Sequence, residues 1–164
     1  MNHLWSPWRY QYLTGERREE GCIFCHIAGH PEEDTANLVA WRGEHNFVVL
    51  NRFPYTSGHL MVVPYAHRAE LAAADEQTVS EMMLLARAAE NHLRAIYKPE
   101  GLNLGMNIGE SAGAGIAGHI HMHVLPRWPG DTNFMTTVGE TRVLPEELSI
   151  TLTRVRGAFQ GGEL

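Results

Sequence analysis

The 164-residue sequence predicts one α+β domain, because strand-like segments surround a single long amphipathic helix. In Ala74–Tyr97, apolar side chains recur every three or four residues, which is typical of a helix with one buried face. Asp75 can cap the start of this helix, and Lys98-Pro99 ends it. Hydrophobic residues make up 44% of the chain and no repeat or linker divides it, so one hydrophobic core is expected.

The strand predictions rest on runs rich in apolar and β-branched residues, bounded by turn-forming residues. Two strands before the helix form a hairpin across Arg52–Gly58, and two more follow the helix. The segment Glu146–Phe159 is either a short helix or a strand. The four predicted strands are Asn46–Asn51, His59–Pro64, Leu102–Ile108 and His119–Leu125, and Pro126 is expected to stop the last.

Charge and hydropathy restrict the classes of function. The formal net charge of −6 argues against binding a nucleic acid polymer, although a small phosphorylated substrate remains possible. No apolar run approaches the roughly 18 residues that span a bilayer, so no membrane partner is expected. The first residues lack the basic and apolar pattern of a secretory signal, and we therefore expect a cytoplasmic location.

Histidines alternate with apolar residues in the predicted strand His119–Leu125. Because successive side chains of a strand point to opposite faces, His119, His121 and His123 share one face. The intervening residues share the other face, which should pack on the core beneath the long helix. The histidine face is then free to form a site.

Three interpretations of this face compete. The histidines could lack a role, although strict alternation makes this unfavourable. They could chelate a catalytic metal, but the only carboxylate between Gly109 and Arg127 is Glu110. They could instead supply a nucleophile, since a neutral imidazole is nucleophilic when an acceptor holds its other nitrogen. The preceding loop Gly109–Gly118 favours this last interpretation, because small residues let backbone amides approach a phosphate.

The histidine motif, followed by Pro126-Arg127, resembles the His-x-His-x-His-x-x signature, with apolar x, of the histidine triad (HIT) superfamily. Asn51, Gly58–Pro64 and Asn107–Gly109 also resemble that family's pattern. The resemblance implies a mainly antiparallel five-stranded sheet with a long helix, paired into a homodimer. We expect an N-terminal aromatic arm over 1–21, the HIT domain over 22–128, and a C-terminal tail over 129–164 that packs on the domain.

The resemblance also implies a mechanism. His121 would displace the leaving group from an α-phosphate, and water or phosphate would resolve the resulting nucleotidyl-histidine. The backbone carbonyl of His119 would hold the Nδ1–H of His121, while His123 and His59 would form hydrogen bonds around the phosphate. The further implied contacts are phosphate with Asn107 and the amides of Gly115 and Ile116, ribose with Asn51, and base with Val49.

One position departs from the family pattern. Many members carry Ser or Thr three residues before the first triad histidine, where this chain has Ile116. The leaving-group specificity of those relatives therefore does not carry over directly. Arg127-Trp128 and the aromatic arm Leu4–Tyr10 are similar to bacterial members grouped with diadenosine tetraphosphate phosphorylases. Trp128 is interpreted either as a core or dimer-interface residue, or as one that packs on a base and closes the site.

These features favour a nucleotidyl hydrolase or transferase that cleaves dinucleoside polyphosphates. Two alternatives stay open: a nucleoside phosphoramidase with the same nucleophile, and a nucleotide-binding protein with little turnover. Whether water or phosphate is the acceptor is not decided by the sequence.

Cys22 and Cys25 form a Cys-x-x-Cys pair, which in a cytosolic chain indicates metal binding or redox chemistry. A redox role is disfavoured because no thioredoxin-like βαβ pattern surrounds the pair. A structural zinc site needs two more ligands, and the HIT resemblance places them at His67 and His119. We therefore expect a structural zinc, the alternative being a reduced thiol pair on a loop.

Overall fold

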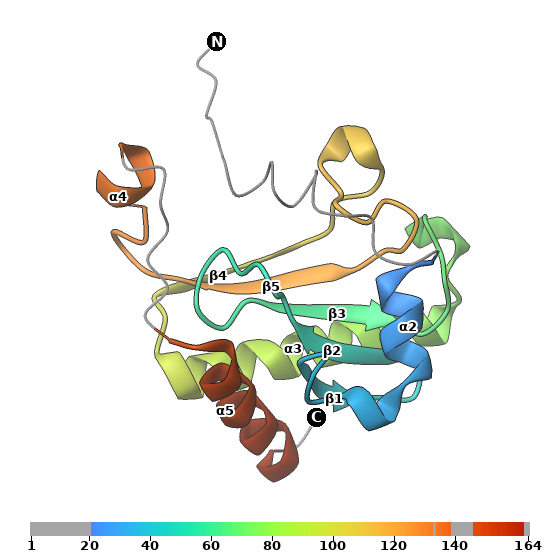
Figure 1. Cartoon of the computed structure of the whole chain (residues 1–164), viewed down its shortest axis with the longest axis horizontal. Helices are drawn as coiled ribbons and strands as arrows, with labels where there is room; N and C mark the ends of the chain where they lie inside the picture. Colours follow the sequence, from blue (N-terminus) through green and yellow to red (C-terminus); the bar gives the residue numbers. More distant parts are fainter. Residues whose placement is uncertain (1–20, 133, 139–145, 163–164) are drawn as a thin grey trace.

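A computed structural model describes residues 21–132, 134–138 and 146–162. Its centre is a five-stranded sheet in the order β1-β2-β3-β5-β4, with every neighbouring pair antiparallel (Figure 1). This confirms the predicted α+β class and the antiparallel sheet. The strands are β1 Val39–Arg42, β2 Asn46–Leu50, β3 Leu60–Pro64, β4 Gly101–Gly105 and β5 Met122–Arg127.

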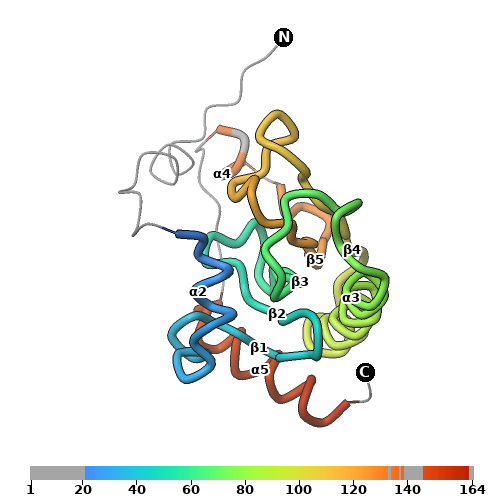
Figure 2. Tube along the Cα trace, turned by 90° about the vertical axis from the view of Figure 1, so that its right-hand side faces the viewer, coloured from blue at the N-terminus to red at the C-terminus, as the bar shows by residue number. Residues whose placement is uncertain are grey.

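Helices cover both faces of the sheet (Figure 2). The helices are α2 Ile23–Gly29, α3 Glu76–Tyr97, α4 Phe134–Thr137 and α5 Leu148–Gly161, with 3-10 turns η1 Pro31–Glu33, η2 Leu71–Ala73 and η3 Glu110–Ala112. On one face, α3 and α5 pack over a core that includes Val62, Ile120 and Val124. On the other, Phe24 and Ile27 of α2 pack against side chains of β2 and β3. Both strands are therefore buried along their whole length.

The long helix α3 begins two residues later than predicted, because Ala74 and Asp75 keep extended backbone. The carboxylate of Asp75 accepts a hydrogen bond from the Thr78 amide at 2.7 Å, as expected of an N-cap. Lys98 adopts the left-handed conformation and ends the helix. None of the helices in the described ranges is long and apolar enough to cross a membrane.

Several boundaries differ from the sequence prediction. The predicted stop at Pro126 is wrong, since β5 continues to Arg127. β3 pairs with β5 only as far as Val124, so Pro126 lies where the ladder on that side has already ended. The strand predicted over Leu102–Ile108 is β4, which starts one residue earlier and ends at Gly105.

Of the two alternatives for Glu146–Phe159, the structure has the helix, α5. The sequence prediction missed α2, β1 and α4, which are short. The aromatic arm was predicted over 1–21, of which residues 1–20 lie outside the described residues.

Candidate active site

The triad histidines lie where the chain enters β5. Only His123 belongs to the regular ladder, so the strand predicted to start at His119 is three residues too long at that end. The segment before β5 is still held by another part of the same chain, because the amide of Ile120 donates to the carbonyl of Arg68 at 2.7 Å. β3 has ended at Pro64, which explains why the pairing there is irregular.

The predicted division into two faces is confirmed. Ile120 and Val124 are buried in the core beneath α3. The histidine rings lie on the opposite face, where Phe24 of α2 lies 5.4 Å from the His119 ring and 5.0 Å from the His121 ring. The helix α2 therefore forms one wall of the histidine site.

A backbone hydrogen bond fixes the tautomer of His121. Its Nδ1 lies 2.9 Å from the backbone carbonyl oxygen of His119, an acceptor that requires the proton on Nδ1. In the neutral ring, Nε2 then carries the lone pair. Burial lowers the pKa of His121 and outweighs the hydrogen bond to the carbonyl, which raises it. A lowered pKa favours the neutral ring, the form that could act as a nucleophile.

His59 and His123 form the second part of the site. The amide of Tyr55 donates to His59 Nδ1 at 3.2 Å, so the proton of a neutral His59 ring sits on Nε2. That Nε2–H donates to His123 Nδ1 at 2.9 Å, which leaves the His123 proton on its own Nε2. Burial, and secondarily the nearby His121, lower the pKa of His123 to about 4. One backbone amide thus makes His123 a neutral donor beside the lone pair of His121.

The glycine loop lies before the triad and contains two left-handed glycines, Gly109 with φ 81° and Gly113 with φ 88°. Asn107 Nδ2 donates to the Gly113 carbonyl at 3.5 Å, which ties the mouth of the loop together. The amides of Gly115 and Ile116 donate to no residue in the described parts of the chain. The Ile116 side chain packs against the core on the α2 side, so a hydroxyl is replaced by an apolar contact.

The other predicted nucleotide contacts are spread around this centre. Asn51 Oδ1 accepts from the amide of Phe53 at 2.9 Å. Val49 is 2% exposed and belongs to the α2-side core. The half-buried Trp128 ring stands perpendicular to Tyr97 of α3, with centroids 6.4 Å apart.

Four predicted metal ligands from three segments of the chain meet at the first triad histidine. The ligand atoms of Cys22, Cys25, His67 and His119 all lie within 4.8 Å of one another, and this cluster could hold a metal ion. Individual Sγ–Nδ1 separations are 3.4 Å for Cys22–His119, 3.2 Å for Cys25–His67 and 3.7 Å for Cys25–His119. Tetrahedral zinc with these ligands has edges of roughly 3.3–3.8 Å. The donor set therefore fits zinc in kind, and these three separations are close to the expected spacing.

Two further observations agree with a cation there. His119 Nε2–H donates to the Pro64 carbonyl at 2.9 Å, which directs the lone pair of Nδ1 toward the cysteines. Partial burial, followed by the neighbouring Cys22, raises the pKa of Cys25. Two thiolates side by side are costly, and a divalent cation would remove that cost.

Sequence reasoning missed three contributors to the site: Phe24, the backbone carbonyl of Pro64, and Tyr55. The ring of Tyr55 lies 4.7 Å from that of His59 and 6.1 Å from that of His123. The sequence offered one indication of this contact: Tyr55 lies four residues before His59, inside the predicted hairpin turn.

Comparison with known proteins identifies the family. A family profile described as the HIT domain matches residues 32–130. An "AP-4-A phosphorylase" of Mycobacterium tuberculosis is 37% identical over 154 residues, which covers 90% of this chain and 79% of the relative. An uncharacterised 16.1 kDa HIT-like protein of Mycoplasma pneumoniae is 32% identical over 120 residues. That alignment covers 73% of this chain and 81% of the relative. The chain belongs to the HIT family.

A solved structure is also similar in fold. The crystal structure of a zinc-bound histidine triad family protein from Mycobacterium smegmatis has a TM-score of 0.69 and 27% sequence identity. The alignment covers 85% of this chain and 94% of that one.

Proposed function

We propose that this HIT-family chain is a nucleotidyl hydrolase or phosphorylase that cleaves dinucleoside polyphosphates such as diadenosine tetraphosphate. The observation that supports the proposal is the fixed tautomer of His121, whose Nδ1–H is bound to the His119 carbonyl and whose lone pair is therefore on Nε2. The name of the mycobacterial relative, "AP-4-A phosphorylase", supports the choice of substrate.

In the proposed reaction, Nε2 of His121 attacks the α-phosphorus of the substrate. A P–N bond forms as the bond between the α-phosphorus and the bridging oxygen breaks, and the rest of the polyphosphate leaves with the electron pair. His123 would donate its Nε2–H to a phosphate oxygen, and the amides of Gly115 and Ile116 would bind the others. Water or inorganic phosphate then displaces His121 from phosphorus.

Replacing His121 with Gly tests the nucleophile. We expect kcat on diadenosine tetraphosphate to fall by roughly a thousandfold or more, because the covalent route is lost. Exposed His26 on α2 supplies a matched control, since H26G also removes an imidazole and should leave kcat nearly unchanged. Near-full activity in H121G contradicts the mechanism.

The same assay identifies the acceptor. Products are analysed with and without added inorganic phosphate. ADP formed only when phosphate is present indicates phosphorolysis, whereas AMP formed without phosphate indicates hydrolysis. The alternative phosphoramidase reading is favoured if only a nucleoside phosphoramidate is turned over.

We further propose that Cys22, Cys25, His67 and His119 hold a structural zinc. Zinc bound there would fix the position of α2 and of the segment before β5, and it would supply no step of the reaction. We also propose that the chain forms a homodimer, as the HIT resemblance implies.

A further inference from the structure

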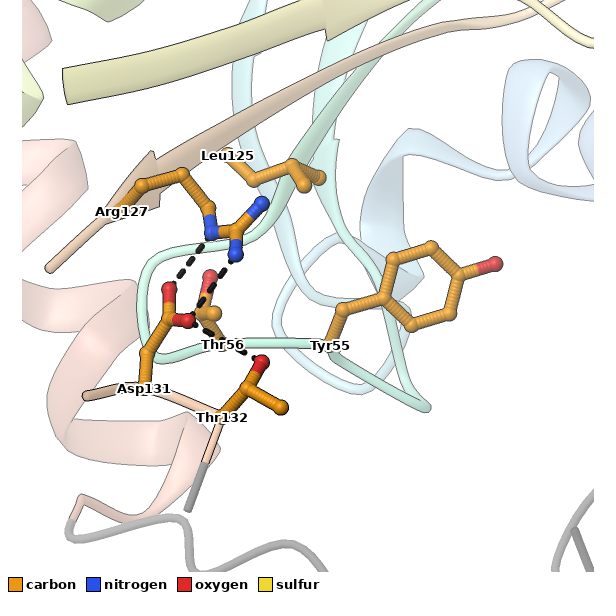
Figure 3. A pocket seen from close by; sticks show the side chains of 6 residues that line it. All are labelled: Tyr55, Thr56, Leu125, Arg127, Asp131 and Thr132. Atoms are coloured by element: carbon orange, nitrogen blue, oxygen red, sulfur yellow. Dashed lines mark hydrogen bonds and ion pairs between the residues drawn. The ribbon is translucent and has the colours of Figure 1, made fainter. Parts of the chain in front are cut away.

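A pocket that none of the predicted site residues line opens at the far end of β5. It is formed by two turns and by the end of the strand, as Figure 3 shows. Its empty volume is about 360 Å³ including the solvent at its mouth, so it can take one end of a ligand whose other end lies outside. The lining residues are Tyr55, Thr56, Leu125, Arg127, Asp131 and Thr132.

The pocket continues the histidine face of β5. Leu125 and Arg127 follow His123 at alternate positions of the strand and therefore share its face. Tyr55 joins the two regions, because it lines the pocket and its ring lies 6.1 Å from the His123 ring. The end of β5 at Arg127 is about 13 Å along the strand from His123. A long polyphosphate leaving group on a substrate attacked at His121 can therefore carry a second nucleoside as far as the pocket.

The polar groups in the pocket suit a nucleotide. The carboxylate of Asp131 accepts from Arg127 Nε at 2.5 Å and from Arg127 Nη2 at 2.9 Å, while Arg127 Nη1 donates to Asn103 at 2.7 Å. These bonds use three of the five guanidinium N–H groups, and the side chain is 43% exposed. The hydrogen bonds from Arg127 hold the pKa of Asp131 at about 2, so its carboxylate is ionised. The Asp131 carboxylate also accepts from the Trp128 amide at 3.3 Å and the Thr132 hydroxyl at 3.4 Å, so it orders the pocket and does not contact the ligand.

Each part of a nucleotide has a matching group. The remaining N–H groups of Arg127 suit a phosphate, and the ring of Tyr55 offers a face for a base. The hydroxyl of Thr56 donates to the Pro126 carbonyl at 3.0 Å, so its oxygen can accept from a ribose hydroxyl. We propose that this pocket binds the distal nucleoside of a dinucleoside polyphosphate, the half that leaves when His121 attacks. The inference rests on the proposed function and assigns the pocket a role in substrate selection.

The test compares two substrates that share the attacked adenylyl group and the four phosphates: diadenosine tetraphosphate and adenosine 5′-tetraphosphate. Only the first has a distal nucleoside. Wild-type kcat/KM should favour it by about tenfold, because remote binding energy is available to it alone. Exposed Thr132 lies at the rim, and Thr132→Phe should fill the pocket and reduce this preference to about twofold or less.

Thr153→Phe is the matched control, because it makes the same change at an exposed position of α5. It should leave the preference intact. A preference that is equal in wild type and Thr132→Phe overturns the pocket assignment, even when turnover is normal.

Failure of the proposed function gives a different pattern, in which wild type cleaves neither compound. Equilibrium binding of the same two compounds then decides about the pocket. Tighter binding of the dinucleotide that is lost in Thr132→Phe supports the assignment, and equal binding of both compounds overturns it.

Discussion

The protonation states of three histidines follow from two backbone groups. The Tyr55 amide sets the tautomer of His59, which in turn sets that of His123. The His119 carbonyl independently sets the tautomer of His121. A backbone amide can only donate and a backbone carbonyl can only accept, so these tautomers are fixed without any ionised side chain. His121 keeps a lone pair on Nε2 and His123 keeps an N–H on Nε2, and the two ring centroids are 4.9 Å apart.

The lowered pKa of His123 predicts acid sensitivity of the fold. The pKa is about 4 in the folded chain against an ordinary value of 6.5. Between these values the unfolded chain binds a proton that the folded chain does not, so the stabilising contribution is complete above pH 6.5 and is lost as pH falls towards 4. Over this window His123→Gln should show a slope of unfolding free energy against pH smaller by up to about 1.4 kcal/mol per pH unit.

Urea unfolding at pH 7, 6 and 5, in the same metal state throughout, measures this slope. His45→Gln serves as the control, since His45 is more exposed and lies at the turn between β1 and β2. Equal slopes for wild type and His123→Gln contradict the prediction.

At the scale of elements, the sequence predicted those with a long or strongly periodic pattern. α3 was found within two residues because its apolar stripe runs over 22 residues and Asp75 caps it. α2 and β1 were missed because seven and four residues carry too little periodicity, and β1 is further disrupted by a bulge between Val39 and Trp41. The spacing of apolar residues therefore predicts a helix or strand reliably only when that element is long.

The candidate site was predictable where residues are close in sequence. Alternation placed the three histidines on one face, and the HIT resemblance supplied His59 and His67. The pocket at the end of β5 was not predictable, because its walls come from the turn at Tyr55 and the loop at Asp131, which only the folded chain brings together. The tautomers likewise depend on hydrogen bonds between distant segments.

If the proposed zinc is bound, it joins α2, through Cys22 and Cys25, to His119 at the start of the triad, and the fold should depend on it. Elemental analysis should find about one zinc per chain, and Cys22→Ser should lose most of it. A metal present at a hundred times its dissociation constant stabilises the fold by about 2.7 kcal/mol, so chelation should lower Tm by roughly 5–10 °C.

Two outcomes contradict the zinc proposal: a metal-free chain with full thermal stability, or a Cys22→Ser variant that keeps its zinc. His30→Asn, a change on the same side of the molecule outside the ligand cluster, controls for general loss of stability.

At the scale of the whole molecule, the two edge strands of the sheet differ in how far other parts of the chain cover them. At the β1 edge, Arg156 of α5 donates to the Val39 carbonyl at 2.9 Å, which covers an edge acceptor. At the other edge, β4 pairs only with β5, and its Leu104 is 42% exposed. Uncovered edge strands pair readily with another chain. If the protein is a homodimer, β4 is the edge where the two copies are expected to meet.

Leu104→Lys tests this arrangement, because a charge on an edge strand opposes pairing and removes the apolar contact. Sedimentation velocity should find wild type dimeric and Leu104→Lys monomeric. Ile150→Lys makes the same change at an exposed apolar position of α5 and should stay dimeric. A Leu104→Lys variant that stays dimeric places the interface elsewhere, and a monomeric wild type contradicts the homodimer itself. If the pocket and the triad are each complete within one chain, the monomeric variant should keep its preference for diadenosine tetraphosphate.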